Sequence, residues 1–65
     1  MSAEESLTKA EELLGRLEEA RARLDSTDDP DVAVEVLQEL AQLAREVEAE
    51  LQRARRATET DATDA

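Results

Sequence analysis

Two stretches of this 65-residue chain carry residues at alternating spacings of four and three, the heptad rhythm of helices that pack along a narrow seam. The first stretch places Ala3, Leu7, Ala10, Leu14, Leu17, Arg21 and Leu24 on this seam. The second places Ala33, Leu37, Leu40, Ala44, Val47, Leu51 and Ala54 there. The pattern predicts an all-α fold, a two-helix antiparallel hairpin of the coiled-coil type.

Local signals set the ends of the first helix, which we expect over about residues 3–24. Ser2 and Glu5 form a capping-box pattern, in which the serine accepts from a backbone amide and the glutamate reaches back. Pairs of an acid four residues before a base, such as Glu19 with Arg23, are predicted to face solvent.

An aspartate-rich segment, 25–29, breaks the periodicity and is predicted to be the turn. Asp29 suits the N-cap of the second helix, Pro30 its first position and Asp31 the positive end of its dipole. These aspartates also raise the hypothesis of a calcium loop, but the segment lacks the glycine and the distal glutamate of an EF-hand. We therefore favour capping.

The second helix is expected over about 30–57, which makes 1–57 one helical hairpin domain. The remaining residues, 58–65, are polar and acidic, and are predicted to form a disordered tail.

Two residues of the first helix have two interpretations each. Gly15 marks either a close approach between helices or simple tolerance of a glycine, and tolerance is favoured. Arg21 either covers the seam with its stem while its charge reaches water, which is favoured, or fixes the register by meeting a carboxylate of a partner.

The residue types present exclude most kinds of catalytic site. The chain has no histidine and no cysteine, so it lacks the ordinary general base near neutrality, a thiolate and the usual nitrogen and sulfur metal ligands. A phosphate-binding loop needs several glycines, and the chain has one. We predict no enzymatic activity, no catalytic, cofactor-binding or metal-binding residue, and no cofactor.

The charge of the chain restricts its partners. Eighteen acidic and eight basic side chains give a net charge of -10, which disfavours direct binding of nucleic acid or of an anionic membrane. No apolar run approaches the roughly 20 residues that a membrane-spanning helix needs, and no secretory signal pattern is present. We expect a cytoplasmic protein whose partners are other proteins.

The first half of the second helix is the candidate binding region. A chain this short buries only about 60% of its unfolded surface, so we expect association to complete a helical bundle. Apolar residues flank the predicted seam on both sides there, which makes the stripe wider than one partner helix covers. The predicted partner-binding residues are Val34, Val36, Leu37, Leu40, Leu43 and Val47.

The layout over about residues 10–55 resembles the exonuclease VII small subunit family. In the first helix the resemblance is carried by Glu11, Glu12, Leu14, Leu17, Glu18, Glu19 and Leu24. In the second it is carried by Ala33, Val34, Val36, Glu39, Leu43, Ala44, Arg45, Leu51 and Ala54. The resemblance implies a non-catalytic subunit that binds helical extensions of a large nuclease subunit, in a complex that degrades single-stranded DNA.

Two other functions remain open at the level of sequence. The hairpin could be a stand-alone oligomerisation or scaffold module, natural or designed, in which two copies form a four-helix bundle. It could also be an acidic decoy that mimics the phosphate charges of DNA.

Overall fold

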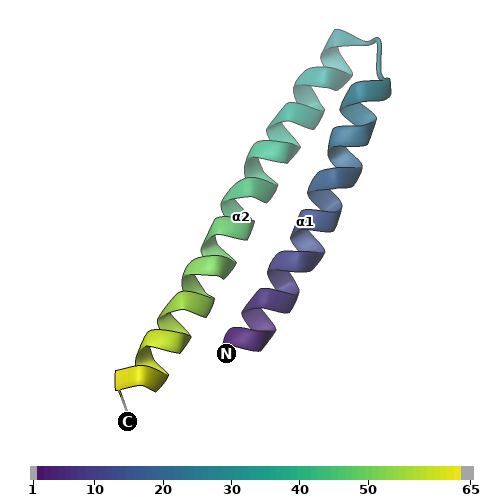
Figure 1. The fold of residues 1–65 in the computed structure, drawn as a ribbon. Helices are drawn as coiled ribbons and strands as arrows, with labels where there is room; N and C mark the ends of the chain where they lie inside the picture. The colour runs from purple at the N-terminus through teal and green to yellow at the C-terminus, as the bar shows by residue number, and fades with distance from the viewer. Residues whose placement is uncertain (1, 64–65) are drawn as a thin grey trace.

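The computed structural model describes residues 2–63, with side chains described through residue 59. It contains two helices, α1 (Ala3–Ser26) and α2 (Pro30–Thr63), which run antiparallel and pack against each other. The hairpin is a rod of 55 × 14 × 13 Å, and the last turns of α2 extend past the start of α1 (Figure 1). The predicted all-α hairpin is confirmed.

The start of α1 has the predicted cap. The amide of Glu5 donates to Ser2 Oγ at 3.1 Å, and the amide of Ser6 donates to the Ser2 carbonyl at 3.1 Å. The carboxylate of Glu5 does reach back, but it accepts from the Ser2 hydroxyl at 3.3 Å. These contacts satisfy amides that the first turn of a helix leaves without partners.

The connection between the helices is shorter than predicted, because α1 continues through Ser26. The Ser26 hydroxyl donates to the Arg23 carbonyl at 3.1 Å, and Thr27 leaves the helix with extended backbone angles of φ -93° and ψ 141°. Thr27 Oγ1 then accepts from the Asp29 amide at 3.2 Å. The side chains of the segment therefore close the turn within residues 27–29.

Asp29 caps α2 as predicted. Its Oδ1 accepts from the Asp31 amide at 2.9 Å, and its carbonyl accepts from the Ala33 amide at 3.0 Å. Pro30 occupies the first helical position, where a missing amide costs nothing. The capping interpretation of Asp29 is confirmed.

The seam between the helices repeats at spacings of three and four, with buried or half-buried residues from both helices. From α1 and its C-cap it takes Ala3, Ser6, Ala10, Leu13, Leu17, Ala20, Leu24 and Thr27. From α2 it takes Ala33, Val36, Leu40, Leu43, Val47, Glu50, Ala54 and Ala57. The core of the hairpin is the set Leu13, Ala20, Val36, Leu43 and Val47, with Leu17, Leu24 and Leu40 packed against it.

Every second member of the predicted seam was wrong. Beyond Leu17 the sequence pattern placed Arg21 in the seam, whereas the structure places Ala20 there with no exposed surface and leaves Arg21 exposed. The same rotation takes Leu7, Leu14, Leu37, Ala44 and Leu51 out of the seam. Ala20 is favoured over Arg21 because burying an alanine costs nothing, while burying an unpaired guanidinium is expensive.

Helix α2 is longer than predicted and continues to Thr63 instead of ending near residue 57. The Thr58 hydroxyl donates to the Ala54 carbonyl at 3.0 Å, and Arg55 Nε pairs with Glu59 Oε1 at 3.1 Å, one turn further on. No proline or glycine interrupts this part of the chain. The prediction of disorder is therefore corrected for residues 58–63, and residues 64–65 lie outside the described part.

Candidate protein-interaction surface

The seam gives the hairpin two broad faces of opposite character. Residues that directly precede a seam position turn toward one face, and residues that directly follow one turn toward the other, since each residue rotates by about 100°. Because the helices are antiparallel, the preceding residues of both helices lie on one face of the hairpin, and the following residues of both lie on the other. We call the face of the preceding residues the charged face and the face of the following residues the apolar face.

The charged face is formed by residues that precede the seam. Helix α1 contributes the bases Lys9, Arg16 and Arg23, and α2 contributes the acids Glu39 and Glu46 opposite them. Arg23 forms an ion pair with Glu39 across the hairpin, so its partner is not Glu19 as the sequence suggested. Arg16, Glu39 and Glu46 line one shallow depression on this face. The two helices therefore complement each other in charge here without a further molecule.

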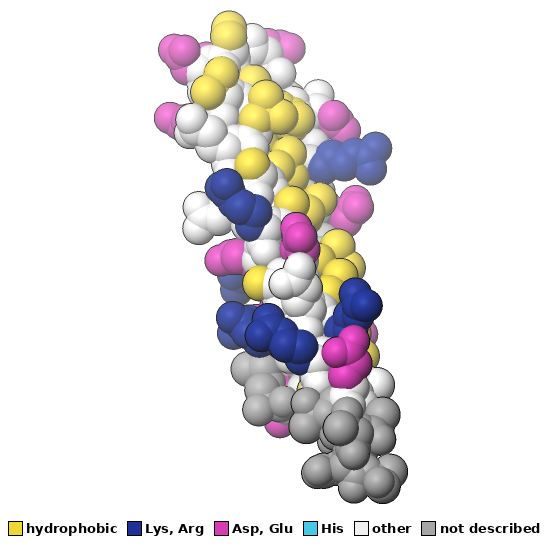
Figure 2. Space-filling model, turned by 90° about the vertical axis from the view of Figure 1, so that its left-hand side faces the viewer, with side chains coloured by type: hydrophobic (Ala, Val, Ile, Leu, Met, Phe, Trp, Pro, Cys, Tyr) yellow, Lys and Arg dark blue, Asp and Glu magenta, His cyan; other side chains and the backbone are white. Residues whose placement is uncertain are grey.

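The apolar face is formed by residues that follow the seam, among them Val34 directly after Ala33. Its large side chains remain substantially exposed: Leu7 46%, Leu14 49%, Val34 54%, Leu37 51% and Leu51 47%. On α2 the exposed alanines Ala41 and Ala44 continue the row. Figure 2 shows hydrophobic side chains in a band that runs from the turn end of the molecule along its length. These side chains are grouped over both helices and are not scattered singly over the surface.

The predicted partner-binding residues divide between the two environments. Val34 and Leu37 lie on the apolar face. Val36, Leu43 and Val47 are buried against α1, and Leu40 is half-buried beside them. For these buried residues the expected availability to a partner is corrected, because α1 already covers them. Val34 and Leu37 stay predictions.

Sequence reasoning missed three leucines of this face: Leu7, Leu14 and Leu51. The pattern assigned them to the seam, because Leu7 and Leu14 share a row with Ala10 and Leu17, and Leu51 continues a row of α2, each as regular as the observed one. For Leu7 and Leu14, Arg21 carried the signal that could have found them, whereas the row of Leu51 contains no charge and gave no such signal. Arg21 continues the row of Leu7 and Leu14 at a spacing of seven, so a row that contains an arginine was the less suitable one to bury.

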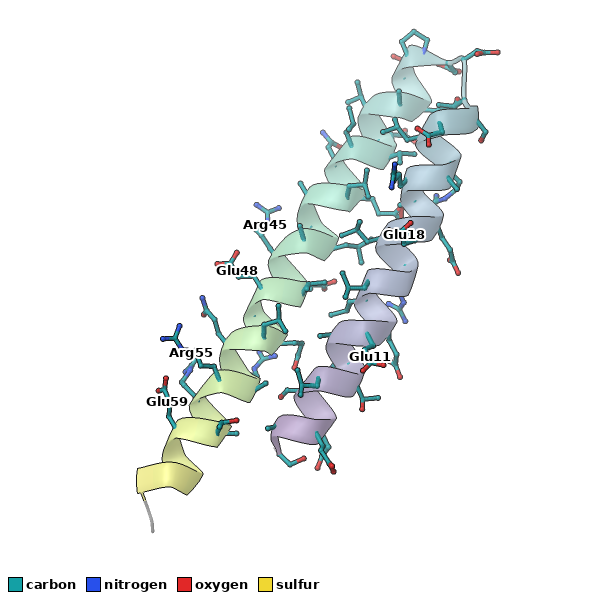
Figure 3. The ribbon with its side chains drawn as sticks, viewed as in Figure 1. Glu11, Glu18, Arg45, Glu48, Arg55 and Glu59 are labelled. Carbon is teal, nitrogen blue, oxygen red and sulfur yellow. The ribbon has the colours of Figure 1, made fainter. Side chains whose placement is uncertain are left out.

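Charged residues border the apolar face on both helices. On α1 the border is acidic, with Glu4, Glu11 and Glu18 spaced by one heptad. On α2 the border is apolar near the turn and becomes charged at Glu48 and Arg55. Figure 3 shows Glu11 and Glu18 on α1, and Arg45, Glu48 and Arg55 on the side of α2 that points away from α1.

One acidic residue lies inside the seam. Glu50 is 4% exposed, its Oε2 is paired with Arg53, and its Oε1 accepts no hydrogen bond. A buried polar group of this kind weakens the hairpin, and its pair with Arg53 lies within α2 and does not connect the two helices. Glu50 therefore belongs to the fold and not to a binding site.

The described residues offer no arrangement for metal binding or membrane crossing. Across residues 2–63 there is no group of three or more acidic side chains placed to hold a metal ion. In the same range, neither helix is both long and apolar enough to cross a bilayer.

Comparison with known proteins leaves the apolar face unassigned. No protein-family model, no curated protein and no solved structure matches this chain. A function has to be inferred from the surface of the hairpin and from the residues that form it.

Proposed function

We propose that this chain is a non-catalytic protein–protein interaction subunit that packs its apolar face against helices of a larger polypeptide. The observation that carries the proposal is the contrast between the faces. Five large aliphatic side chains are about half exposed on one face, while the other face is charged and ion-paired. Covering what remains exposed would contribute about 1 kcal/mol per side chain.

The resemblance to the exonuclease VII small subunit family supplies a specific setting for this role. Of the residues that carry the resemblance, Leu14, Val34 and Leu51 belong to the apolar face, and Glu11 and Glu18 border it. In this setting the partner is the large subunit of a cytoplasmic exonuclease that degrades single-stranded DNA. The hairpin would contribute contacts and no catalytic group.

A pair of matched variants tests the proposal. Leu37→Asp places a charge on the apolar face, whereas Val32→Asp places one at a 39% exposed position that precedes the seam, on the charged face. The tagged chain is purified from its own host, the protein bound to it is identified, and the two recombinant proteins are mixed. We expect wild type and Val32→Asp to bind and Leu37→Asp to lose the partner while keeping its helical circular dichroism.

Two results would contradict parts of the proposal. If Leu37→Asp binds the partner as well as Val32→Asp does, the apolar face is not the binding surface. If removing the chain leaves the degradation of single-stranded DNA by the host extract unchanged, the exonuclease setting is wrong, although the interaction role remains.

The alternative is self-association of the hairpin. The exposed leucines lie on both helices, with Leu7 and Leu14 on α1 and Leu37 and Leu51 on α2, so the apolar face is two helices wide and has the width of a second hairpin. Sedimentation equilibrium of the isolated chain separates the two functions. A discrete dimer or tetramer that Leu37→Asp converts to a monomer supports self-association.

A further inference from the structure

We infer that the occupant of the apolar face is an amphipathic helix of another protein whose apolar stripe is bordered by lysine or arginine. The inference rests on the proposed function and adds the charge of the partner. It begins with the border of α1, where Glu4, Glu11 and Glu18 follow one another at heptad spacing. Within the described part of the chain, none of these three carboxylates takes part in an ion pair.

The acidic border differs from the charges on the opposite face. There the bases of α1 meet acids of α2, as Arg23 meets Glu39. Beside the apolar face the border row of α1 faces outward and carries acids, while the base Arg21 lies near the turn in the row of Leu7 and Leu14. A helix lying along the leucines would meet these acids at its own flanks, in the way that flanking charges select partners in coiled coils.

A second copy of this chain fits the face less well. Two copies can stack face to face with a two-fold axis in one of two ways. If α1 lies on α1 of the other copy, the two rows of glutamates face each other. Each copy also brings a net charge of -10.

The other stacking places α1 on α2 of the second copy. Within the hairpin Arg23 lies opposite Glu39. Glu11 lies twelve residues before Arg23 and Leu51 twelve residues after Glu39, so Glu11 and Leu51 are level. Glu48 and Arg55 of the second copy, three and four residues from Leu51, then both lie within about one turn of Glu11. The first stacking therefore brings like charges together along the border, where they lower affinity, while the second has a mixed border and is opposed by the net charge of the two copies. A helix with basic borders avoids this repulsion and pairs with the glutamates.

The inference is tested with synthetic peptides of about four heptads, long enough to form a helix on binding. One peptide carries a leucine stripe bordered by lysine, and a second carries the same stripe bordered by glutamate. A third has the composition of the first with its leucines distributed around the helix. Binding to the full chain is measured by isothermal titration calorimetry at low and at moderate salt.

Two double variants with the same change in net charge locate the effect. Glu11→Gln with Glu18→Gln alters the border of the apolar face, and Glu12→Gln with Glu19→Gln alters the adjacent row of the same helix, which turns toward the charged face. We expect the lysine-bordered peptide to bind the chain more tightly than the other two. The first double variant should weaken that binding roughly tenfold, as the loss of two partly exposed ion pairs implies, and the second should leave it within about twofold.

The outcomes separate this inference from the function on which it rests. If both double variants weaken binding equally, only the total charge matters and the inference fails. If the glutamate-bordered peptide binds as tightly as the lysine-bordered one, and Leu37→Asp abolishes both, the apolar face binds helices but does not select basic ones. If Leu37→Asp leaves binding intact, the proposed function fails as well. A stable dimer that binds neither peptide identifies a second copy as the occupant and overturns the inference.

Discussion

Replacing Glu50 by leucine is expected to stabilise the hairpin, although it removes an ion pair. The side chain of Glu50 is 5% exposed, and its Oε1 is buried without a hydrogen-bond partner. An unsatisfied buried acceptor costs about 1–3 kcal/mol, and a buried leucine contributes about 1.5–3 kcal/mol. The lost pair with Arg53, whose side chain is 52% exposed, is worth less than about 1 kcal/mol.

The expected gain in the free energy of unfolding is therefore about 2–4 kcal/mol, within the range seen when buried ion pairs are replaced by aliphatic residues. Glutamate and leucine have similar helix propensities, so this change does not alter the helix itself. For a chain of this size the gain corresponds to a rise in melting temperature of roughly 10 °C or more.

Urea denaturation followed by far-UV circular dichroism measures this gain, and several protein concentrations separate folding from association. Glu46→Leu, at an exposed position one turn away, is the control and should change stability by less than about 0.5 kcal/mol. The sequence pattern instead placed Leu51 in the seam and Glu50 beside it. A Glu50→Leu variant no more stable than Glu46→Leu would refute the observed rotation of the helix.

Three further substitutions test other parts of the hairpin. Gly15→Ala should raise the free energy of unfolding by about 1 kcal/mol in a urea titration, because an added methyl group meets nothing within 4 Å; a loss of stability would show that the position is crowded. Leu13→Ala should cost about 2–5 kcal/mol by thermal melting and Leu14→Ala under about 1 kcal/mol, since Leu13 is 7% exposed and Leu14 is 49% exposed; equal costs would contradict the assigned faces. Asp29→Ala should cost about 1 kcal/mol by the same melt, because the cap of α2 is lost, and an unchanged melting temperature would mean that the cap contributes nothing.

The sequence alone determined the features that depend on near neighbours along the chain. Ser2 and Asp29 cap the helices through contacts with residues two to four positions away, and Pro30 fits only the first turn of a helix. Such contacts form in any helix that begins at these residues. Two helices and one short turn of this composition leave an antiparallel hairpin as the simplest way to bury an apolar stripe.

The end of α2 was not determined in this way. The polar residues after Ala57 are compatible with a tail or with further helix. The structure continues the helix through the contacts of Thr58 and Glu59 with the preceding turn. Residues of weak or mixed preference take the conformation of the helix that precedes them when no helix breaker intervenes.

Only the tertiary structure decided which side of each helix faces its neighbour, and therefore where the apolar face lies. On each helix two rows that share every second residue compete for the seam, through Leu13 or Leu14 on α1 and through Val36 or Leu37 on α2. The rows differ only at alternate positions, where neighbouring residues lie about 100° apart around the helix, and the pattern of a single helix does not choose between them. In the observed packing the two helices bury Leu13, Ala20, Val36 and Leu43 together and keep Arg21 in water, although Glu50 enters the seam on α2.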